Sequence, residues 1–196
     1  MSPVTHLLTG WLTAHTADLS RRDRALVTLS GVVPDIDALG VLVELATKNT
    51  STPLYWWSYY HHVLCHNLGF ALVLATAVIL LAVRRWMTVL LALAAFHLHL
   101  LADLVGSKGL DGYQWPIPYL LPFSNRWQLT WDGQWGLNAW PNILLTALFL
   151  VVTLYLACKR GYSPLELISK KTDNAFVAAL RRRFGAPAGY SKQQIT

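Results

Sequence analysis

Three long apolar runs constrain the fold of this chain more than any other feature of its sequence. They cover residues 63–83, 87–105 and 140–158, and each approaches the ~20 residues that an α-helix needs to cross a bilayer. Charged residues make up only 13% of the chain, about half of their share in an average globular domain. Three buried helices of a soluble bundle are the alternative, but such helices normally keep a polar face. We therefore predict an all-α, polytopic membrane bundle with about three full transmembrane helices.

Two shorter apolar segments before these runs are predicted to be helices of the same bundle. Residues 4–17 are too few to cross a bilayer upright, and residues 25–33 end at Pro34. A proline disfavours the helical conformation of the residue before it, so we expect a break at residues 33–37 and a new helix at residues 38–47. The predicted fold class is thus a bundle of spanning helices and two shorter N-terminal helices around a polar site.

Basic residues cluster at the ends of the apolar runs and give the chain a net charge of +6. The clusters are Arg21, Arg22 and Arg24; Arg84 and Arg85; Lys159 and Arg160; and Lys170, Lys171 and Arg181 to Arg183. None accompanies a motif that reads a nucleic-acid groove, so we expect no nucleic-acid partner. Because basic loops remain in the cytoplasm, we predict a multi-pass protein of the inner or plasma membrane whose partners are membrane lipids.

The distribution of charge also divides the chain into two predicted parts. Residues 1–160 are predicted to form the membrane-embedded domain, and residues 161–196 a basic cytoplasmic tail. Within the tail, residues 174–184 could form a surface helix with its arginines toward anionic headgroups. Apolar side chains recur there at four-residue spacing, which would place them on the opposite face.

The segment 96–103, FHLHLLAD, places polar side chains inside the second apolar run. His99 and Asp103 are four residues apart, so on a helix they lie on one face and can reach the same ion. A carboxylate in an apolar helix costs several kcal/mol unless it is paired. Either a divalent cation or another side chain would supply that partner.

Other acids and histidines could complete such a site. Asp35 and Asp37 lie in the PDID break, where capping of the next helix would need only one of them. Three histidines, His61, His62 and His66, stand at the start of the first apolar run. On a regular helix His62 and His66 would share a face, whereas His61 would converge with His66 only if it lies before the helix begins.

Membrane topology predicts that these residues meet at one level. With the basic clusters in the cytoplasm, the polar ends of the first two runs lie toward the outer face, together with the break at residues 33–37 and the start of residues 4–17. Tryptophans gather in residues 48–62 and 107–140, and this residue type prefers the membrane–water boundary. We therefore predict a shared site near the outer face, with the long loop at residues 107–138 as its lid.

Five short motifs stand in a fixed order along roughly residues 5–125. They are TH near the start, PDID, the outer histidines of HHVLCH, HLLAD before a glycine-containing turn, and LLPF before Ser124. This order resembles the YdjM-type family of membrane-bound metal-dependent hydrolases, which is distantly similar to the all-helical zinc-dependent phospholipases C. The resemblance implies a metal site made of His6, Asp35 or Asp37 or both, His61, His66, His99 and Asp103.

Two departures from the family pattern bear on the histidines at the start of the first run. His62 stands where the family commonly has arginine, and Asn67 where it often has serine. Helix geometry pairs His62 with His66, whereas the resemblance pairs His61 with His66. We follow the resemblance because the mouth of a helix can be irregular, and the role of His62 stays open.

These residues support two functional hypotheses. The first is a hydrolase with one or two divalent ions, zinc above all and manganese as the alternative, because imidazole and carboxylate groups suit both. Asp35 or Asp37 would be the general base, and a phosphoester or other ester of a lipid or lipid-linked molecule would be the substrate. The second is a non-enzymatic membrane protein that binds or transports metal or serves as an interaction subunit. Polar residues near one side of the membrane favour the hydrolase.

Overall fold

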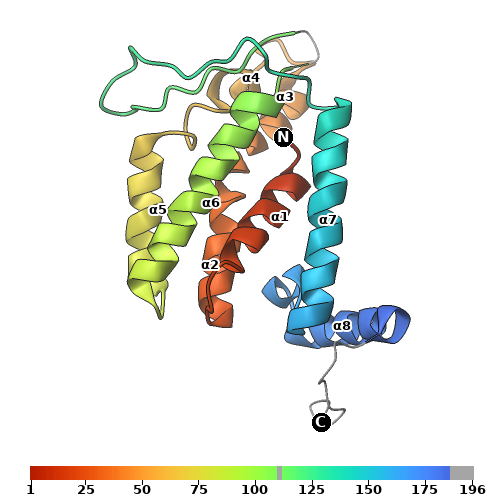
Figure 1. Ribbon diagram of the computed structural model, residues 1–196. Coiled ribbons are helices and arrows are strands. Elements are labelled where there is room, and N and C mark those ends of the chain that lie inside the picture. Colours follow the sequence, from red (N-terminus) through yellow and green to blue (C-terminus); the bar gives the residue numbers. More distant parts are fainter. Residues whose placement is uncertain (110–111, 186–196) are drawn as a thin grey trace. The chain divides into compact units, whose positions relative to one another are not determined.

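The computed structural model describes residues 1–109 and 112–185, and this part of the chain is all-helical (Figure 1). It contains eight α-helices, two 3₁₀ helices and no strand, which confirms the predicted class. Leu110 and Asp111 of the predicted lid loop and residues 186–196 of the predicted tail lie outside the described residues. In chain order the elements are α1 (Pro3–Ala14), α2 (Arg21–Ser30), η1 (Val33–Leu39), α3 (Gly40–Thr47), α4 (Trp56–Tyr60), α5 (Leu68–Leu81), α6 (Arg85–Gly106), α7 (Trp140–Arg160), η2 (Pro164–Leu167) and α8 (Lys170–Phe184).

The chain divides into two compact units, Met1–Thr146 and Ala147–Thr196. The division lies inside α7, and the boundary expected at residue 160 stays a prediction. Helix α8 of the second unit includes the whole segment for which a surface helix is predicted. Its first turn is joined to η2 within that unit, because the Ser163 hydroxyl donates to Asp173 Oδ1 over 2.6 Å.

Two helices, α6 and α7, are long and apolar enough to cross a membrane. A third span exists if α2 and the continuous η1–α3 segment act together, since this pair passes the same test but is bent by 49° at its break. The described part of the chain therefore has two or three candidate spans. The break lies next to Pro34, the second residue of η1, which lacks the backbone N–H that would continue α2.

The expected span over residues 63–83 is wrong in its length. Helix α5 begins at Leu68 and has only 14 residues, too few to cross a bilayer alone. Residues 61–67 are irregular because His62 has a left-handed backbone, with φ of 68°, and Asn67 is extended, with φ of −137° and ψ of 169°. This short segment carries three histidines, so its departure from helix decides where their rings point.

Asn67 holds the irregular segment to the start of α5. Its Oδ1 accepts a hydrogen bond from the backbone N–H of Phe70 over 2.9 Å, which caps the helix. Its Nδ2 donates to the carbonyl oxygens of Val63 and Leu64 over 2.7 and 3.0 Å. The side chain is buried, and its three hydrogen bonds are partly shielded from water.

We expect Asn67→Ala to lower the free energy of unfolding by about 2 kcal/mol, because it removes the cap together with the two hydrogen bonds that the side-chain amide donates. Asn67→Asp is the matched control: it keeps the cap but cannot donate, so its loss is expected to be smaller. Urea unfolding of the protein in mild detergent measures both. Equal losses for the two variants would mean that the cap contributes nothing.

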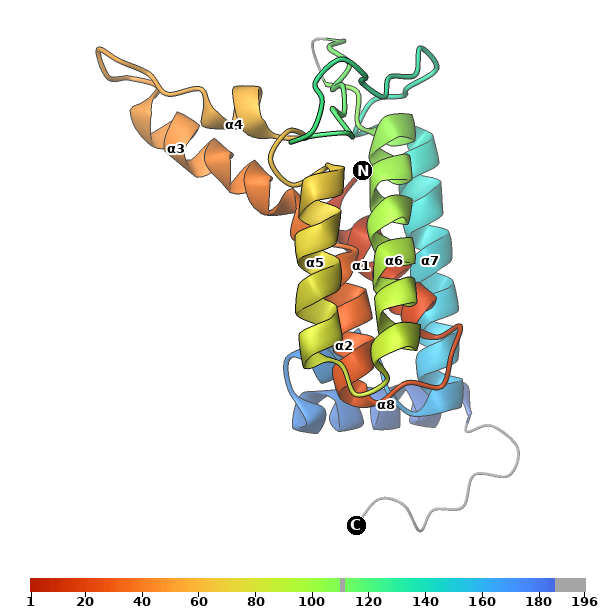
Figure 2. The ribbon, with the colours of Figure 1, turned by 90° about the vertical axis from the view of Figure 1, so that its left-hand side faces the viewer.

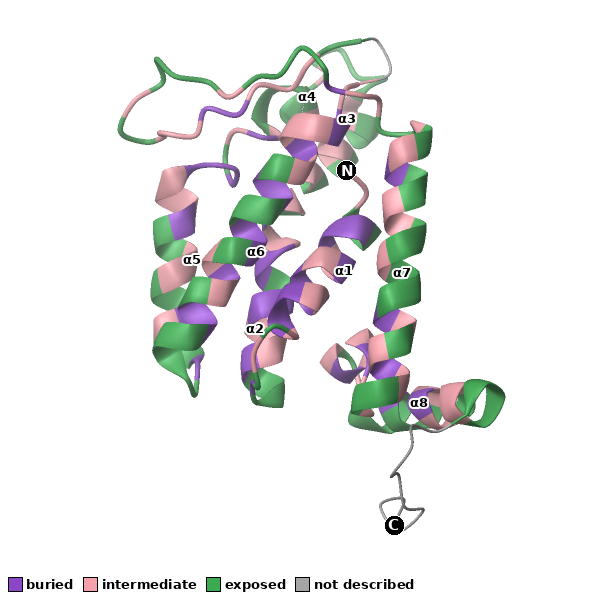
Figure 3. Cartoon of the chain, viewed as in Figure 1, coloured by how far each residue is buried: buried purple, intermediate pink, exposed green. Residues whose placement is uncertain are grey.

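Helix α1 lies at the centre of the first unit, where it packs against α2 and α6. Most of its surface is buried (Figure 3). At its crossing with α2 the backbones touch: a Cβ added at Gly10 would lie 2.5 Å from the carbonyl oxygen of Thr28. The crossing therefore requires glycine, and it fixes the position of His6, which lies one turn earlier on α1.

The loop between α6 and α7 covers the start of α5. The backbone N–H groups of Leu68 and Gly69 donate to the carbonyl oxygens of Tyr119 and Leu121 over 2.7 and 2.9 Å. Ile117 of the same loop is fully buried, packed in one cluster with Ala71, Phe96 and Leu100. The predicted long loop is thus present and anchored on α5 and α6.

Helices α3 and α4 extend away from α5 and α6 as a side arm (Figure 2). None of the residues of α3 is buried, although most of them are apolar. The exposed apolar side chains of the arm include Leu42, Leu45, Trp56 and Tyr59. An apolar surface of this size on a membrane protein is suited to contact with lipid.

Candidate metal centre

Eight acidic and histidine side chains from four parts of the first unit lie close together. Helix α1 supplies one histidine, η1 two aspartates, the irregular segment 61–67 three histidines, and α6 one histidine and one aspartate. His6, His66 and His99 have no exposed surface, and Asp103 is 2% exposed. The eight residues are His6, Asp35, Asp37, His61, His62, His66, His99 and Asp103.

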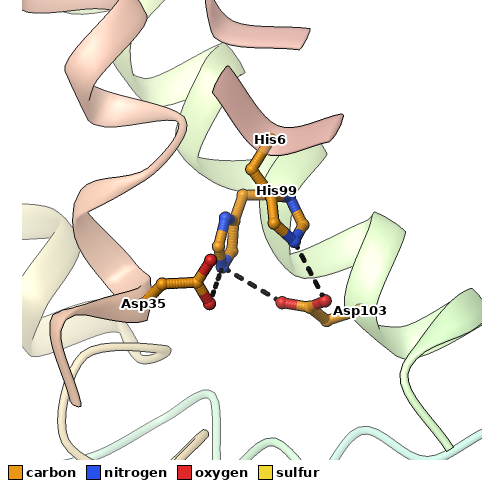
Figure 4. A group of neighbouring side chains, drawn as sticks. All are labelled: His6, Asp35, His99 and Asp103. Atoms are coloured by element: carbon orange, nitrogen blue, oxygen red, sulfur yellow. Dashed lines mark hydrogen bonds and ion pairs between the residues drawn. The ribbon is translucent and has the colours of Figure 1, made fainter. Parts of the chain in front are cut away.

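His6, Asp35, His99 and Asp103 form the first of two groups that could hold a metal ion (Figure 4). Each residue offers one ligand atom, an imidazole nitrogen or a carboxylate oxygen, and these four atoms all lie within 4.8 Å of one another. Asp103 stands between the two rings, with Oδ1 3.1 Å from His6 Nε2 and Oδ2 3.1 Å from His99 Nε2. Asp35 approaches from η1, and its Oδ1 lies 3.7 Å from His99 Nε2.

A backbone carbonyl orients the ring of His99. Its Nδ1 lies 2.9 Å from the carbonyl oxygen of Gly31, at the end of α2. Because a carbonyl oxygen only accepts, Nδ1 donates, and the lone pair of the neutral ring is on Nε2. Nε2 is the atom that faces Asp35 and Asp103, so the His99 ring presents its metal-binding nitrogen to the group.

His62, His66 and Asp103 form the second group, so the Asp103 carboxylate belongs to both. Asp103 Oδ2 lies 3.6 Å from His66 Nε2 and 3.8 Å from His62 Nε2. The groups also meet through their histidines, because His66 Nε2 lies 3.0 Å from His99 Nε2. This is the arrangement expected of two neighbouring ion sites that share one carboxylate.

Asp37 lies beside the two groups and orients their neighbours. Its Oδ1 lies 2.8 Å from His61 Nδ1, and its Oδ2 lies 3.1 Å from His66 Nδ1. Oδ2 also accepts the backbone N–H of Cys65 over 3.2 Å. A carboxylate bonded to Nδ1 leaves Nε2 of His66 free for metal. Burial and the charge of Asp37 raise the pKa of the Cys65 thiol to about 11, so it is protonated at neutral pH and is a poor ligand.

His62 and His66 have pKa values shifted in opposite directions. Burial lowers the pKa of His62 well below its ordinary value, and the charge of Asp103 offsets this only in part. Burial also lowers the pKa of His66, but the carboxylates of Asp103 and Asp37 outweigh it and raise the pKa to about 9. His62 is therefore neutral at pH 7, whereas an ion bound by His66 would displace a proton.

Several polar atoms of the two groups are buried without a hydrogen-bond partner in the described part of the chain. They are His6 Nδ1, Asp35 Oδ2, both ring nitrogens of His62, and Asp103 Oδ2. Asp103 Oδ2 is close to His99 Nε2 but makes no hydrogen bond with it. The α-amino group of Met1 pairs with the other oxygen of this carboxylate, Oδ1. Each unpartnered atom costs about 1–3 kcal/mol. Carboxylate and imidazole lone pairs suit zinc or manganese, so these residues fit a divalent cation.

The comparison with protein families covers the whole region that builds this centre. The model of the YdjM inner membrane protein family matches residues 1–170. The chain belongs to the YdjM inner membrane protein family. No curated protein and no solved structure matches it significantly. The resemblance inferred from the order of the motifs is confirmed, and the protein is an inner membrane protein with a buried His/Asp cluster.

The predicted ligands of this YdjM-family protein fall into two sets. Those that lie in the two groups are His6, Asp35, His66, His99 and Asp103. Asp37 and His61 lie outside both groups, where they bond to each other. As ligands or catalytic residues, all seven stay predictions.

The structure also brings His62 into the second group, a residue whose role the sequence left open. The i, i+4 spacing of His62 and His66 also predicted that these two residues pair, but on the assumption that both lie on a regular helix. The two residues lie in an irregular segment, where the left-handed backbone of His62 lets its ring reach toward Asp103. Few non-glycine residues adopt this conformation, and those that do are concentrated at functional sites.

Proposed function

We propose that this YdjM-family protein is a metal-dependent hydrolase that acts on a phosphoester or other ester of a lipid or lipid-linked molecule. The observation that carries the proposal is the Asp103 carboxylate, which is buried between two histidine groups with Oδ2 unpartnered. Two neighbouring cation sites with a shared carboxylate are suited to the displacement chemistry of phosphoesters.

The residues of the two groups would divide the work between binding and proton transfer. His6, His99 and Asp35 would hold one ion and His62 and His66 the other. Bound divalent ions would supply a water of lowered pKa and neutralise charge on a phosphoryl group. The histidines would hold these ions with Nε2 lone pairs, and hydrogen bonds at Nδ1 fix the direction of the rings of His66 and His99.

Asp35 is the better of the two predicted general bases. Both oxygens of Asp37 are already occupied by donors from His61, His66 and Cys65. Asp35 has its Oδ2 without a hydrogen-bond partner, and its side chain is 15% exposed. With Oδ1 directed toward the ion of the first group, Oδ2 of Asp35 would remain to accept the proton of an attacking water.

The position of the site supports a substrate at the membrane–water boundary. Helix α6 begins next to the cationic pair Arg84 and Arg85, and Asp103 lies at its other end. Under the positive-inside rule the arginines would be cytoplasmic and the site would face the outer side of the inner membrane. The apolar arm of α3 and α4 would then lie at the same boundary.

A non-enzymatic metal transporter is the second candidate, and α6 argues against it. Transport needs polar groups along a path through both halves of the membrane. The first half of α6, residues 85–96, offers only Thr88 beyond its terminal arginine and Trp86, and Thr88 is buried. The polar side chains of this helix that belong to the site are confined to its second half.

The proposal predicts metal-dependent hydrolysis by the purified protein. The full chain in lipid nanodiscs would be stripped with chelator, reloaded with zinc or manganese, and assayed with bis(p-nitrophenyl) phosphate and with mixed phospholipid vesicles. We expect chelation to remove the activity and metal to restore it. We expect His99→Ala to lower the rate by at least about 100-fold, because it removes a ligand.

His97→Ala is the matched control for this experiment. His97 lies two residues away on the same helix, is exposed, and contacts Tyr119 outside the two groups. Its variant should keep both metal and activity. Hydrolysis that survives chelation, or that falls equally in the two histidine variants, would refute a metal-dependent mechanism at this centre.

A further inference from the structure

A pocket of about 230 Å³ opens beside the metal centre. It lies between the segment that follows α4 and the loop between α6 and α7, both in the first unit. Ligand sites for drug-sized molecules span roughly 300–1,000 Å³, so this pocket has room for about one ring rather than for a long chain. Neither group of the metal centre forms its wall.

Trp115 and His61 separate the pocket from the second metal-binding group. The Trp115 ring lies 5.1 Å from the ring of His61 and 5.5 Å from that of His62, measured between centroids. His61 lines the pocket and His62 belongs to the group. A molecule seated in the pocket would therefore be one side chain away from a ligand of the centre.

Aromatic rings form one wall of the pocket. Tyr59, Tyr113 and Trp115 line it, and Tyr113 meets Trp115 edge-on at 5.9 Å. Trp57 packs against Trp115 at 5.2 Å and supports it from outside the pocket. Rigid aromatic surfaces of this kind offer flat apolar contact at little cost in entropy.

Uncharged hydrogen-bonding side chains also line the pocket. Asn125 and Gln128 are exposed on the loop, and each amide offers two donors and an acceptor. Ser58 donates its hydroxyl to Glu44, over 3.0 Å to Oε1, so its oxygen remains an acceptor toward the pocket. Among the described residues, the lining contains no aspartate, glutamate, lysine or arginine.

We propose that this pocket binds an uncharged hydroxylated ring, a sugar or cyclitol, carried by the phosphoester on which the metal centre acts. The C–H face of such a ring packs against aromatic side chains, while its hydroxyls donate to and accept from amides. The lining of this one pocket offers both kinds of side chain, and its volume suits a single ring. The role of the ring in a reaction rests on the proposed function, but its binding does not.

A quaternary ammonium group is the competing occupant, because aromatic rings also attract cations. Among the described residues the lining provides no carboxylate for such a group, and Glu44, which accepts hydrogen bonds from Ser58, does not line the pocket. The amides of Asn125 and Gln128 would have no partner on a methylated ammonium. The two amides thus favour an occupant with hydroxyl groups over a quaternary ammonium group.

Calorimetric titration of the metal-loaded protein in nanodiscs tests the assignment. The soluble probes are myo-inositol 1-phosphate, glycerol 1-phosphate, which lacks the ring, and phosphocholine, which carries the cation. We expect the inositol phosphate to bind at least about tenfold more tightly than either of the others, and Asn125→Leu and Gln128→Leu each to reduce this preference about fivefold. Competition by phosphatidylinositol in the nanodisc would assign the ring to a lipid, and its failure to a soluble phosphoester.

Asn138→Leu is the control, because Asn138 is exposed on the same loop and does not line the pocket. Equal affinity for the ring and ringless phosphates, tighter binding of phosphocholine, or unchanged preference in both variants would overturn the assignment. Retained metal content shows that a variant is folded. Ring preference without any hydrolysis would refute the proposed function alone, whereas hydrolysis that is indifferent to the ring would refute this assignment alone.

Discussion

Asp103→Asn is expected to abolish metal binding at both groups of the centre. Asp103 is the only residue that the two groups share, and both of its oxygens face histidine nitrogens. Asparagine has nearly the same shape but lacks the negative charge, and its amide nitrogen cannot donate a lone pair to an ion. Elemental analysis of the purified protein by mass spectrometry would count the ions for each chain.

The comparison with Asp35→Asn makes this result specific. Asp35 belongs to the first group only, so its variant should lose one ion and keep the other. Asp132→Asn, at an exposed acid on the loop far along the chain, should lose none. Full metal content in the Asp103 variant, or equal loss in the variants of Asp103 and Asp35, would contradict a shared ligand.

Gly10→Val is expected to have the largest effect on stability. Its Cβ would lie 2.5 Å from the carbonyl oxygen and 3.1 Å from the Cα of Thr28, and neither backbone atom can move without displacing α2. Overpacking of this kind costs about 3 kcal/mol. Because His6 is on the same face of α1, the variant should also lose the ion of the first group.

Chemical unfolding in detergent, together with metal content, measures both consequences. Gly136→Val is the matched control, because a Cβ at Gly136 meets nothing closer than 3.5 Å. The control should unfold like the unmodified protein and retain its metal. If the Gly10 variant were equally stable, the contact between α1 and α2 would be looser than the structure describes.

The parts of the site that depend on helix periodicity could be predicted from the sequence. His99 and Asp103 are four residues apart in a long apolar run, so a regular helix places both on one face. The structure has that helix over Arg85–Gly106. The same reasoning placed the short first helix, which carries His6 in its first turns. Here local sequence and final structure agree because nothing interrupts the helix.

The segment 61–67 could not be predicted in this way. Its apolar residues continue the pattern of α5, yet the segment is held out of the helix by the cap at Asn67 and by contacts with Asp37. The contacts with Asp37 join residues 28 and 29 positions apart in the chain, and no periodicity records them. For the same reason the sequence could not tell that Asp37 bonds to two histidine rings rather than lying in a ligand group.

The carboxylate of Asp103 has a thermodynamic consequence if both groups bind ions. A ligand that serves two equilibria couples them, and such coupling is reciprocal: the factor by which the first ion changes the affinity for the second equals the factor in the opposite direction. Occupancy of the two positions would then be cooperative or anticooperative rather than independent. Cellular metal supply would set not only how many ions are present but also the order in which the half-loaded and fully loaded forms appear.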